Sequence, residues 1–355
     1  MSNNSHHLKI GISIGDLNGI GIEIIIKALS DQRILEDCTP IIYGSTKAIS
    51  FYKKNIPEHD FAYQSIKSAE QADIKKINVI NCWQEEVEIV PGQKTTIGGE
   101  YSLKSLEAAT ADLAANKIDV LVTAPISKEN IQKAGFQFPG HTEYLADMSG
   151  GAEALMMMVS QSLRVALVTS HIPLSEVAKN ITKEAILNKL KIFNQSLKKD
   201  FKIVRPRIAV LGLNPHAGEK GKIGNEEMDI IHPAIQQAKD LGMTVMGTYP
   251  ADGFFGSNLM DEFDGVLAMY HDQGLTPFKA LAFDSGVNFT AGLPIVRTSP
   301  DHGTAFDIAG KNCASEHSFR NAIYLAIDVY RNREFSKEID ANPLKKQTET
   351  NKGDN

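Results

Sequence analysis

Short apolar runs alternate with longer segments of helical periodicity along most of this 355-residue chain. Residues 9–14, 40–43, 77–80 and 118–122 have the length and apolar composition of buried strands, whereas residues 98–116 have the period of a long helix. Such alternation is typical of an α/β fold with a largely parallel sheet. The length is sufficient for two domains with sizeable cores.

The charge, the cysteines and the chain ends narrow the class of protein. The formal net charge is −6 and no basic run occurs, which argues against a nucleic-acid partner. The three cysteines are far apart and form no CxxC pair, which fits a reducing cytosol. The N-terminus lacks the apolar core of a signal peptide, and no run reaches the ~18–20 apolar residues of a membrane span. We therefore expect a cytoplasmic protein with no membrane partner, and a disordered tail over residues 341–355.

A glycine-rich turn, GDLNGIGIE at residues 15–23, follows the first predicted strand. One interpretation is a dinucleotide-binding fingerprint, but the spacing is not GxGxxG and no acidic residue closes a βαβ unit. The other interpretation is a tight turn from a strand into an apolar helix. The sequence leaves both open.

Three predicted strands are each followed by a histidine. His171 follows residues 163–168, His216 follows residues 207–211, and His271 directly follows residues 266–270. Because the carboxyl ends of parallel strands share one edge of a sheet, the three imidazoles are expected to converge there. Three neutral imidazoles suit Zn²⁺ or Co²⁺ and leave positions open for substrate oxygens. The separations match no short zinc motif, so the alternative is three unrelated surface histidines.

Other polar side chains surround these strand ends in the predicted fold. His141 and Thr142 stand at the start of a helix, where backbone N–H groups favour anions. Lys279 and Arg297 are suited to neutralise a phosphate or carboxylate, and Asn288 to orient a hydroxyl. For Lys279 a solvated helix face is the alternative.

Seven segments of this chain together resemble a known family. They are GDLNGIGIE, LVTAPISKENI, FPGHTEYLA, VALVTSHIPLSEV, LGLNPHAGEKGKIGNEE, YHDQGLTPFKAL and VNFTAGLPIVRTSPDHGTAFDIAGK. In this order, and over residues 9–331, they are similar to the 4-hydroxythreonine-4-phosphate dehydrogenases of pyridoxal phosphate biosynthesis. Departures from the family occur at Leu17, Asn18 and Ile22, where members commonly have prolines or a small residue. None of these positions matches a ligand contact.

The resemblance implies two α/β/α domains similar to those of isocitrate and isopropylmalate dehydrogenases, with the active-site cleft between them. Residues 1–140 and 280–340 would form the cofactor-side domain, and residues 141–279 the metal-binding and dimerisation domain. The family also implies a homodimer in which both subunits complete each site.

The resemblance further implies a role for each candidate residue. One Zn²⁺, Co²⁺ or Mg²⁺ ion would be held by His171, His216 and His271. Substrate would be held by His141, Thr142, Lys279, Asn288 and Arg297, and either Lys279 or Asp272 would move the proton. NAD or NADP would lie against the loop 301–311, at His302, Gly303 and Asp307.

The implied reaction is metal-dependent, NAD(P)-linked oxidation of 4-phosphohydroxy-L-threonine at its 3-hydroxyl. The product, 2-amino-3-oxo-4-phosphooxybutanoate, would lose CO₂ to give 3-amino-2-oxopropyl phosphate. Three alternatives stay open at this point. In the first, the substrate is a threonate or erythronate 4-phosphate. In the second, the protein is a phosphoester-binding module without activity. In the third, it transfers acyl groups to phosphate.

Overall fold

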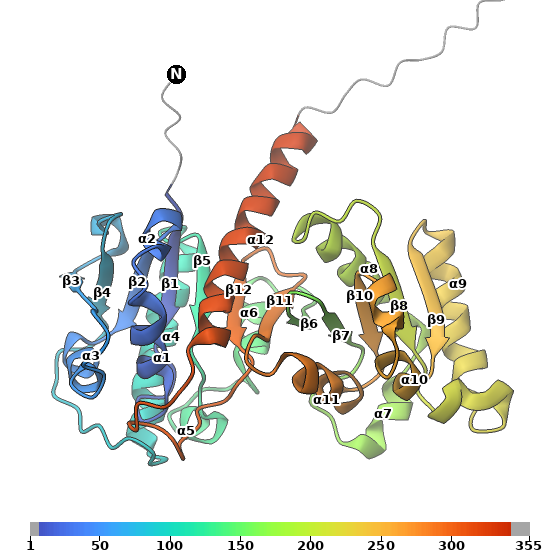
Figure 1. The fold of residues 1–355 in the computed structure, drawn as a ribbon, viewed down its shortest axis with the longest axis horizontal. Coiled ribbons are helices and arrows are strands. Elements are labelled where there is room, and N and C mark those ends of the chain that lie inside the picture. Colours follow the sequence, from blue (N-terminus) through green and yellow to red (C-terminus); the bar gives the residue numbers. More distant parts are fainter. Residues whose placement is uncertain (1–6, 342–355) are drawn as a thin grey trace, which may run out of the picture.

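The structure, a computed structural model, describes residues 7–341, in which twelve strands form a single mixed sheet (Figure 1). In spatial order the strands are β3 (Tyr63–Ile66), β4 (Ile77–Asn81), β2 (Thr39–Gly44), β1 (Lys9–Ser13), β5 (Val120–Thr123), β12 (Arg297–Pro300), β11 (Val287–Ala291), β6 (Leu155–Val159), β7 (Arg164–Leu167), β10 (Gly265–Ala268), β8 (Arg207–Leu211) and β9 (Thr244–Tyr249). Eight of the pairings are parallel and three are antiparallel. The prediction of a largely parallel α/β sheet is therefore confirmed.

The antiparallel pairings divide the sheet into two parallel blocks. β11 runs antiparallel to both β12 and β6, and β6 runs antiparallel to β7. The twist of a sheet accumulates from strand to strand. The three antiparallel pairings give the two blocks opposite strand directions within the sheet. In Figure 1 the helices that follow β5, β7 and β10 nevertheless lie along the same lower side of the molecule. The ends of strands from both blocks thus border one region.

Helices cover both faces of the sheet. They are α1 (Gly21–Leu29), α2 (Ile34–Asp37), α3 (Thr46–Lys53), α4 (Thr96–Ala114), α5 (Lys128–Lys133), α6 (His141–Met148), α7 (Leu174–Asn180), α8 (Lys183–Lys199), α9 (His232–Asp240), α10 (Ala251–Phe255), α11 (His271–Ala282) and α12 (His317–Ala341). Short turns of other helical types occur at η1 (Ala69–Gln71), η2 (Pro215–Gly221), η3 (Glu227–Ile231) and η4 (Asn258–Glu262). The predicted helix at residues 98–116 is α4, whose first turn is capped by the Thr95 hydroxyl accepting from the Gly98 N–H.

The centre of the core joins the two blocks. α12 packs on β5, β12 and β11, and α8 packs beside it on β11 and β6. Phe289 of β11 and Phe319 of α12 are fully buried in this layer. Burial of each such side chain stabilises the fold by about 1.5–3 kcal/mol. The antiparallel strands are thus fixed by the same helices that cover the parallel ones.

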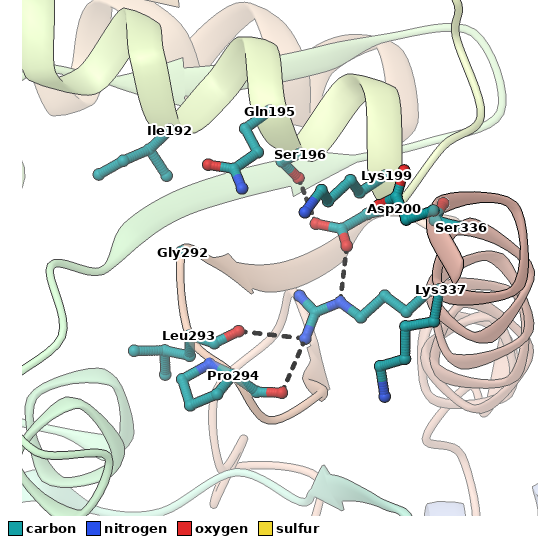
Figure 2. A pocket seen from close by; sticks show the side chains of 12 residues that line it. Ile192, Gln195, Ser196, Lys199, Asp200, Gly292, Leu293, Pro294, Ser336 and Lys337 are labelled. Atoms are coloured by element: carbon teal, nitrogen blue, oxygen red, sulfur yellow. Dashed lines mark hydrogen bonds and ion pairs between the residues drawn. The ribbon is translucent and has the colours of Figure 1, made fainter. Parts of the chain in front are cut away.

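An ion pair ties the end of α8 to α12. Arg333 Nε donates to Asp200 Oδ1 at 2.7 Å, and its Nη1 donates to the carbonyls of Leu293, Pro294 and Ile295. A cavity of about 570 Å³ adjoins this pair, between α8, the β11–β12 loop and α12 (Figure 2). None of the predicted site residues lines it.

Three further expectations concern the extent of the chain. The division into residues 1–140 with 280–340 and residues 141–279 stays a prediction. α12 ends at Ala341, the first residue of the predicted tail, and residues 342–355 lie outside the described residues. Between residues 7 and 341, every helix is too short or too polar to cross a membrane.

Candidate functional site

The three strands that precede the histidines are neighbours in the sheet. β10 lies between β7 and β8 and runs parallel to both, so the loops that follow them leave the sheet at one edge. His171 lies between β7 and α7, and His271 is the first residue of α11. Their ring centroids are 5.7 Å apart. The strand-end pattern in the sequence therefore brings at least two of the imidazoles together.

The environment of His171 favours the neutral form of its imidazole, and a carboxylate orients His271. Partial burial lowers the pKa of His171, and the charge of Lys128 lowers it further. His271 Nδ1 donates to Asp272 Oδ1 at 2.7 Å, which leaves Nε2 free. A carboxylate on one ring nitrogen is the usual means of orienting a metal-binding imidazole through the other.

His216 lies in η2, beyond the end of β8, where the backbone adopts a left-handed conformation. Every residue from His216 to Lys220 has a positive φ, between 42° and 76°. For an L-residue this conformation costs roughly 1–2 kcal/mol. Together with Asp272, His216 lines an open cavity of about 540 Å³. Within residues 7–341 no three His, Cys, Asp or Glu side chains lie close enough to hold a metal ion, so convergence of all three histidines stays a prediction.

Arg297 forms a second centre at the start of β12. It is only 3% exposed, and its guanidinium donates to Thr123 Oγ1 through Nε at 3.1 Å and Nη2 at 2.8 Å, and to Thr290 Oγ1 at 3.4 Å. Burial lowers its pKa to about 10. In the described chain no carboxylate lies within ion-pair distance of this guanidinium. A buried cation without a counter-ion is unfavourable unless an anion joins it.

His141, the first residue of α6, completes this centre. Burial, and then the charge of Arg297, holds the pKa of His141 well below its usual value. Arg297 Nη2 lies 3.1 Å from His141 Nδ1. Because a guanidinium only donates, Nδ1 must accept and Nε2 must carry the proton. That Nε2 is buried without a hydrogen-bond partner among the described residues. The site therefore has an unused N–H donor next to the buried guanidinium of Arg297.

A cavity of about 260 Å³ lies between the start of α6 and the end of β7. Thr142 and Glu143 line it from α6, and His171 lines it from the loop after β7. The charge of Glu143 raises the pKa of both Arg297 and His171, so the carboxylate faces both centres. One predicted substrate-binding residue, Thr142, and one predicted metal ligand, His171, therefore line the same cavity.

Lys128 is a site residue that the sequence pattern did not single out. It is the first residue of α5, and its Cε lies 3.9 Å from where a Cβ on Gly140 would be. Its charge lowers the pKa of both His141 and His171, and no ion pair within the described residues engages it. Its place after the strand-end segment Thr123–Ser127 was the available signal.

Lys279 and Asn288 lie at the β12 side of the site. Lys279 Nζ pairs with Asp301 Oδ1 at 3.2 Å, so Lys279 is not simply a solvated residue of a helix face. Asp301 is largely buried, which raises its pKa, while the charges of Lys279 and His271 lower it. The pairing of Lys279 with Asp301 is a contact that the sequence did not indicate. Asn288 has a buried Oδ1 with no partner among the described residues.

The predicted cofactor loop packs against the first glycine turn. The Ile20 N–H donates to the Thr304 carbonyl at 3.1 Å. His302 has a buried Nε2 without a described partner, and burial lowers its pKa, whereas Gly303 and Asp307 are exposed. Because Thr304 covers the N-terminus of α1, the structure favours a tight strand-to-helix turn over a dinucleotide fingerprint.

Buried side chains of α1 bind the backbone just after this loop, at Ala314. Glu23 and Lys27 form an ion pair at 2.9 Å on α1. Glu23 Oε1 also accepts from the Ala314 N–H, and Lys27 Nζ donates to the Ala314 carbonyl, both at 2.9 Å. The glycine turn and its helix thus form the support of the predicted cofactor loop.

The fold and the site define a class of α/β protein with a buried site suited to a small anion. The anion donors are the guanidinium of Arg297 and the imidazole N–H of His141, and His171 and His271 form a second cluster. The chain belongs to the family of the pyridoxal phosphate biosynthetic protein PdxA, whose model matches residues 36–326. The family resemblance deduced from the motifs is thereby confirmed.

Individual relatives agree with this assignment. A 4-hydroxythreonine-4-phosphate dehydrogenase from Bacteroides thetaiotaomicron is 52% identical over 96% of this chain and 93% of its own length. A putative D-threonate 4-phosphate dehydrogenase from Oceanobacillus iheyensis is 40% identical over 90% of this chain and 97% of its own. The crystal structure of 4-hydroxythreonine-4-phosphate dehydrogenase from Klebsiella pneumoniae superimposes with a TM-score of 0.78 at 34% identity, covering 91% of this chain and 99% of that one.

Proposed function

We propose that this protein is a 4-hydroxythreonine-4-phosphate dehydrogenase of pyridoxine 5′-phosphate biosynthesis. It oxidises 4-phosphohydroxy-L-threonine at the 3-hydroxyl, with a divalent metal ion and NAD or NADP. The observation that carries the proposal is the buried Arg297, which forms no ion pair within residues 7–341 and adjoins His141, whose Nε2 is buried without a partner there. A relative that is 52% identical to this chain and bears this name supports the substrate.

The substrate phosphate is proposed to bind between Arg297 and His141. The guanidinium supplies fixed donors, and the neutral His141 donates through Nε2. Thr142, in the cavity that contains His171, adds a hydroxyl at the start of α6. Asn288 and Lys279 are proposed to contact the remaining polar groups of the substrate. In this proposal the C3 end of the substrate points towards the histidine pair.

A divalent ion is proposed to bind at His171 and His271, with His216 as the third ligand. The donor chemistry fits, because His171 is held neutral and Asp272 orients His271. Imidazoles favour Zn²⁺ or Co²⁺ over Mg²⁺, which prefers oxygen. When bound, such an ion supplies Lewis-acid polarisation of the reacting hydroxyl and carbonyl oxygens.

Proton transfer is proposed for Lys279, with Asp272 in an orienting role. Asp272 Oδ1 accepts from His271 Nδ1, so that oxygen is engaged at the imidazole. Lys279 pairs with the largely buried Asp301. In the proposed step the neutral amine of Lys279 would accept the proton of the substrate hydroxyl and would then release it to solvent from the ammonium form. The nicotinamide dinucleotide is proposed to lie along His302, Gly303 and Asp307 and to accept the hydride.

A homodimer that completes the site is part of the proposal. Apolar side chains are exposed beside two of the three histidines. Ile172 and Leu174 follow His171 and are 37% and 74% exposed, and Ile223 and Met228 lie just past the His216 turn. Such a surface is suited to a second copy of the chain. We also propose that the protein acts in the cytoplasm.

The test of the function is a substrate profile. Formation of reduced nicotinamide is followed by absorbance with 4-phosphohydroxy-L-threonine, D-threonate 4-phosphate and erythronate 4-phosphate, each with NAD or NADP and a divalent ion. We expect the highest kcat/KM with 4-phosphohydroxy-L-threonine. The threonate ester is the second candidate, because a relative named for it is 40% identical to this chain. A preference for that ester would reassign the substrate, and no reduction with any of the three would refute a dehydrogenase.

A further inference from the structure

The turn that carries His216 is held by one buried carboxylate. Glu227 is 1% exposed and begins η3, a π-helical turn of the kind often found at functional sites. Its Oε1 accepts the backbone N–H groups of Leu213 at 2.8 Å and Asn214 at 2.7 Å. Its Oε2 accepts from Asn214 Nδ2 at 3.0 Å. Glu227 therefore binds the two residues through which the chain leaves β8 for His216.

The glycines around Glu227 fit this contact closely. A Cβ on Gly218, within the positive-φ turn, would lie 2.5 Å from Glu227 Oε2. A Cβ on Gly212, at the end of β8, would lie 3.2 Å from Glu227 Oε1. The carboxylate thus occupies space that only glycine leaves free, on both sides of His216.

This arrangement accounts for a backbone that is otherwise unfavourable. His216, Ala217, Glu219 and Lys220 all have positive φ, and left-handed backbone persists only where its surroundings impose it. The N–H groups of Leu213 and Asn214 point at one carboxylate oxygen, which fixes the direction of the chain into the turn. The side chain of His216 makes no hydrogen bond to the rest of the described chain, so its position depends on this backbone.

We propose that Glu227 is a positioning residue that holds the left-handed turn in place, and so presents His216 for binding a divalent cation. The inference rests on the proposed function for the identity of the ligand. It predicts that loss of the Glu227 carboxylate weakens cation binding without removing any ligand atom. Loss of an outer residue that orients a metal ligand typically costs about 10–100-fold in metal affinity.

The neighbouring residue provides a matched control. Glu226 Oε2 also accepts from Asn214 Nδ2, at 2.8 Å, but among the described residues it accepts neither the Leu213 nor the Asn214 backbone N–H. Glu226→Gln and Glu227→Gln remove the same charge from adjacent positions. Glutamine at position 227 offers the Leu213 and Asn214 N–H groups only a neutral acceptor and turns a donor towards Asn214 Nδ2. A difference between the two variants therefore reports these weakened contacts and not the net charge.

The first measurement is made on the full-length, metal-free protein. Amide hydrogen exchange is followed by mass spectrometry in peptides that cover residues 213–220. We expect faster exchange in Glu227→Gln than in the parent, and no change in Glu226→Gln. Equal exchange in the parent and Glu227→Gln would overturn the inference, whatever the protein's activity.

The second measurement is titration with Co²⁺, followed by its visible absorbance. We expect the Kd of Glu227→Gln to rise by about tenfold or more, with the parent's spectrum recovered at saturation, and that of Glu226→Gln to stay within about twofold. If Glu227→Gln does not fold, Gly218→Ala presses on the same carboxylate and is expected to weaken binding in the same way. A parent-like Kd in the folded variant would overturn the inference. Failure of the parent to bind Co²⁺ would instead remove the proposed metal site, and this inference with it.

Discussion

The neutral state of His141 leads to a specific pH dependence of stability. Burial, reinforced by Arg297, holds the pKa of His141 well below 6.5 in the folded protein, whereas the unfolded chain has the ordinary value. Below that value the unfolded state binds a proton that the folded state does not. The stabilisation is therefore fully present above pH 6.5 and is lost as the pH falls towards the folded-state pKa.

The magnitude follows from linkage. A group that stays neutral in the folded state, with an unfolded pKa of 6.5, lowers the free energy of unfolding by about 1 kcal/mol between pH 6.5 and about pH 5.5. His171 and His302 also have lowered pKa values and add to the total loss. The share of His141 is isolated by His141→Asn, since asparagine can still accept from Arg297 and donate on its other side but does not titrate.

The assay is urea unfolding of the parent and of His141→Asn at both pH values. The parent is expected to lose about 1 kcal/mol more than the variant on acidification. Added inorganic phosphate should reduce this difference, because an anion beside Arg297 and His141 offsets the charge that opposes protonation. Equal losses in the two proteins would show that His141 titrates normally, and would refute the claim that it donates to phosphate as a neutral imidazole.

Three further outcomes test other contacts. Arg297→Lys cannot reproduce the forked donors, and loss of one charge-assisted hydrogen bond, worth about 1.5–3 kcal/mol, should lower kcat/KM by about 10–150-fold in steady-state assays. Lys128→Met should raise the KM for the phosphorylated substrate more than that for the dinucleotide; equal effects on both would contradict its place in the anion site. Lys27→Met leaves Glu23 buried without its partner and should cost about 3–5 kcal/mol in urea unfolding, whereas Arg33→Met, at an exposed pair, should leave the urea midpoint nearly unchanged.

Much of the fold could be predicted because its signals are local. Apolar runs of strand length, helical periodicity and the Pro139–Gly140 turn before α6 are each properties of short segments. They predicted the α/β class, the strand-end histidines and the start of the helix at His141. The antiparallel strands β6 and β11 were not foreseen, because strand direction depends on which distant segments pair.

The missing parts of the site are long-range contacts. Lys128, at the start of α5, acts electrostatically on His141 and His171, which belong to later segments of the chain. Asp301 pairs with Lys279, which precedes it by 22 residues. Glu227 is within fifteen residues of His216, but its role depends on a left-handed turn that the letters NPHAGE do not reveal. A sequence indicates which residue types can do chemistry, and packing decides which of them face one another.

The most direct test of the central claim is the metal dependence of turnover in the parent and in His216→Ala. Both proteins are stripped with a chelator, supplied with 4-phosphohydroxy-L-threonine and NAD, and titrated with Zn²⁺ or Co²⁺ while reduced nicotinamide is measured. If the strand-end histidines hold the ion that the reaction requires, the parent regains activity with added metal. His216→Ala should remain folded, as judged by circular dichroism, and inactive at the same metal concentration. Full metal-restored activity in His216→Ala, or a parent indifferent to chelation, would contradict the account.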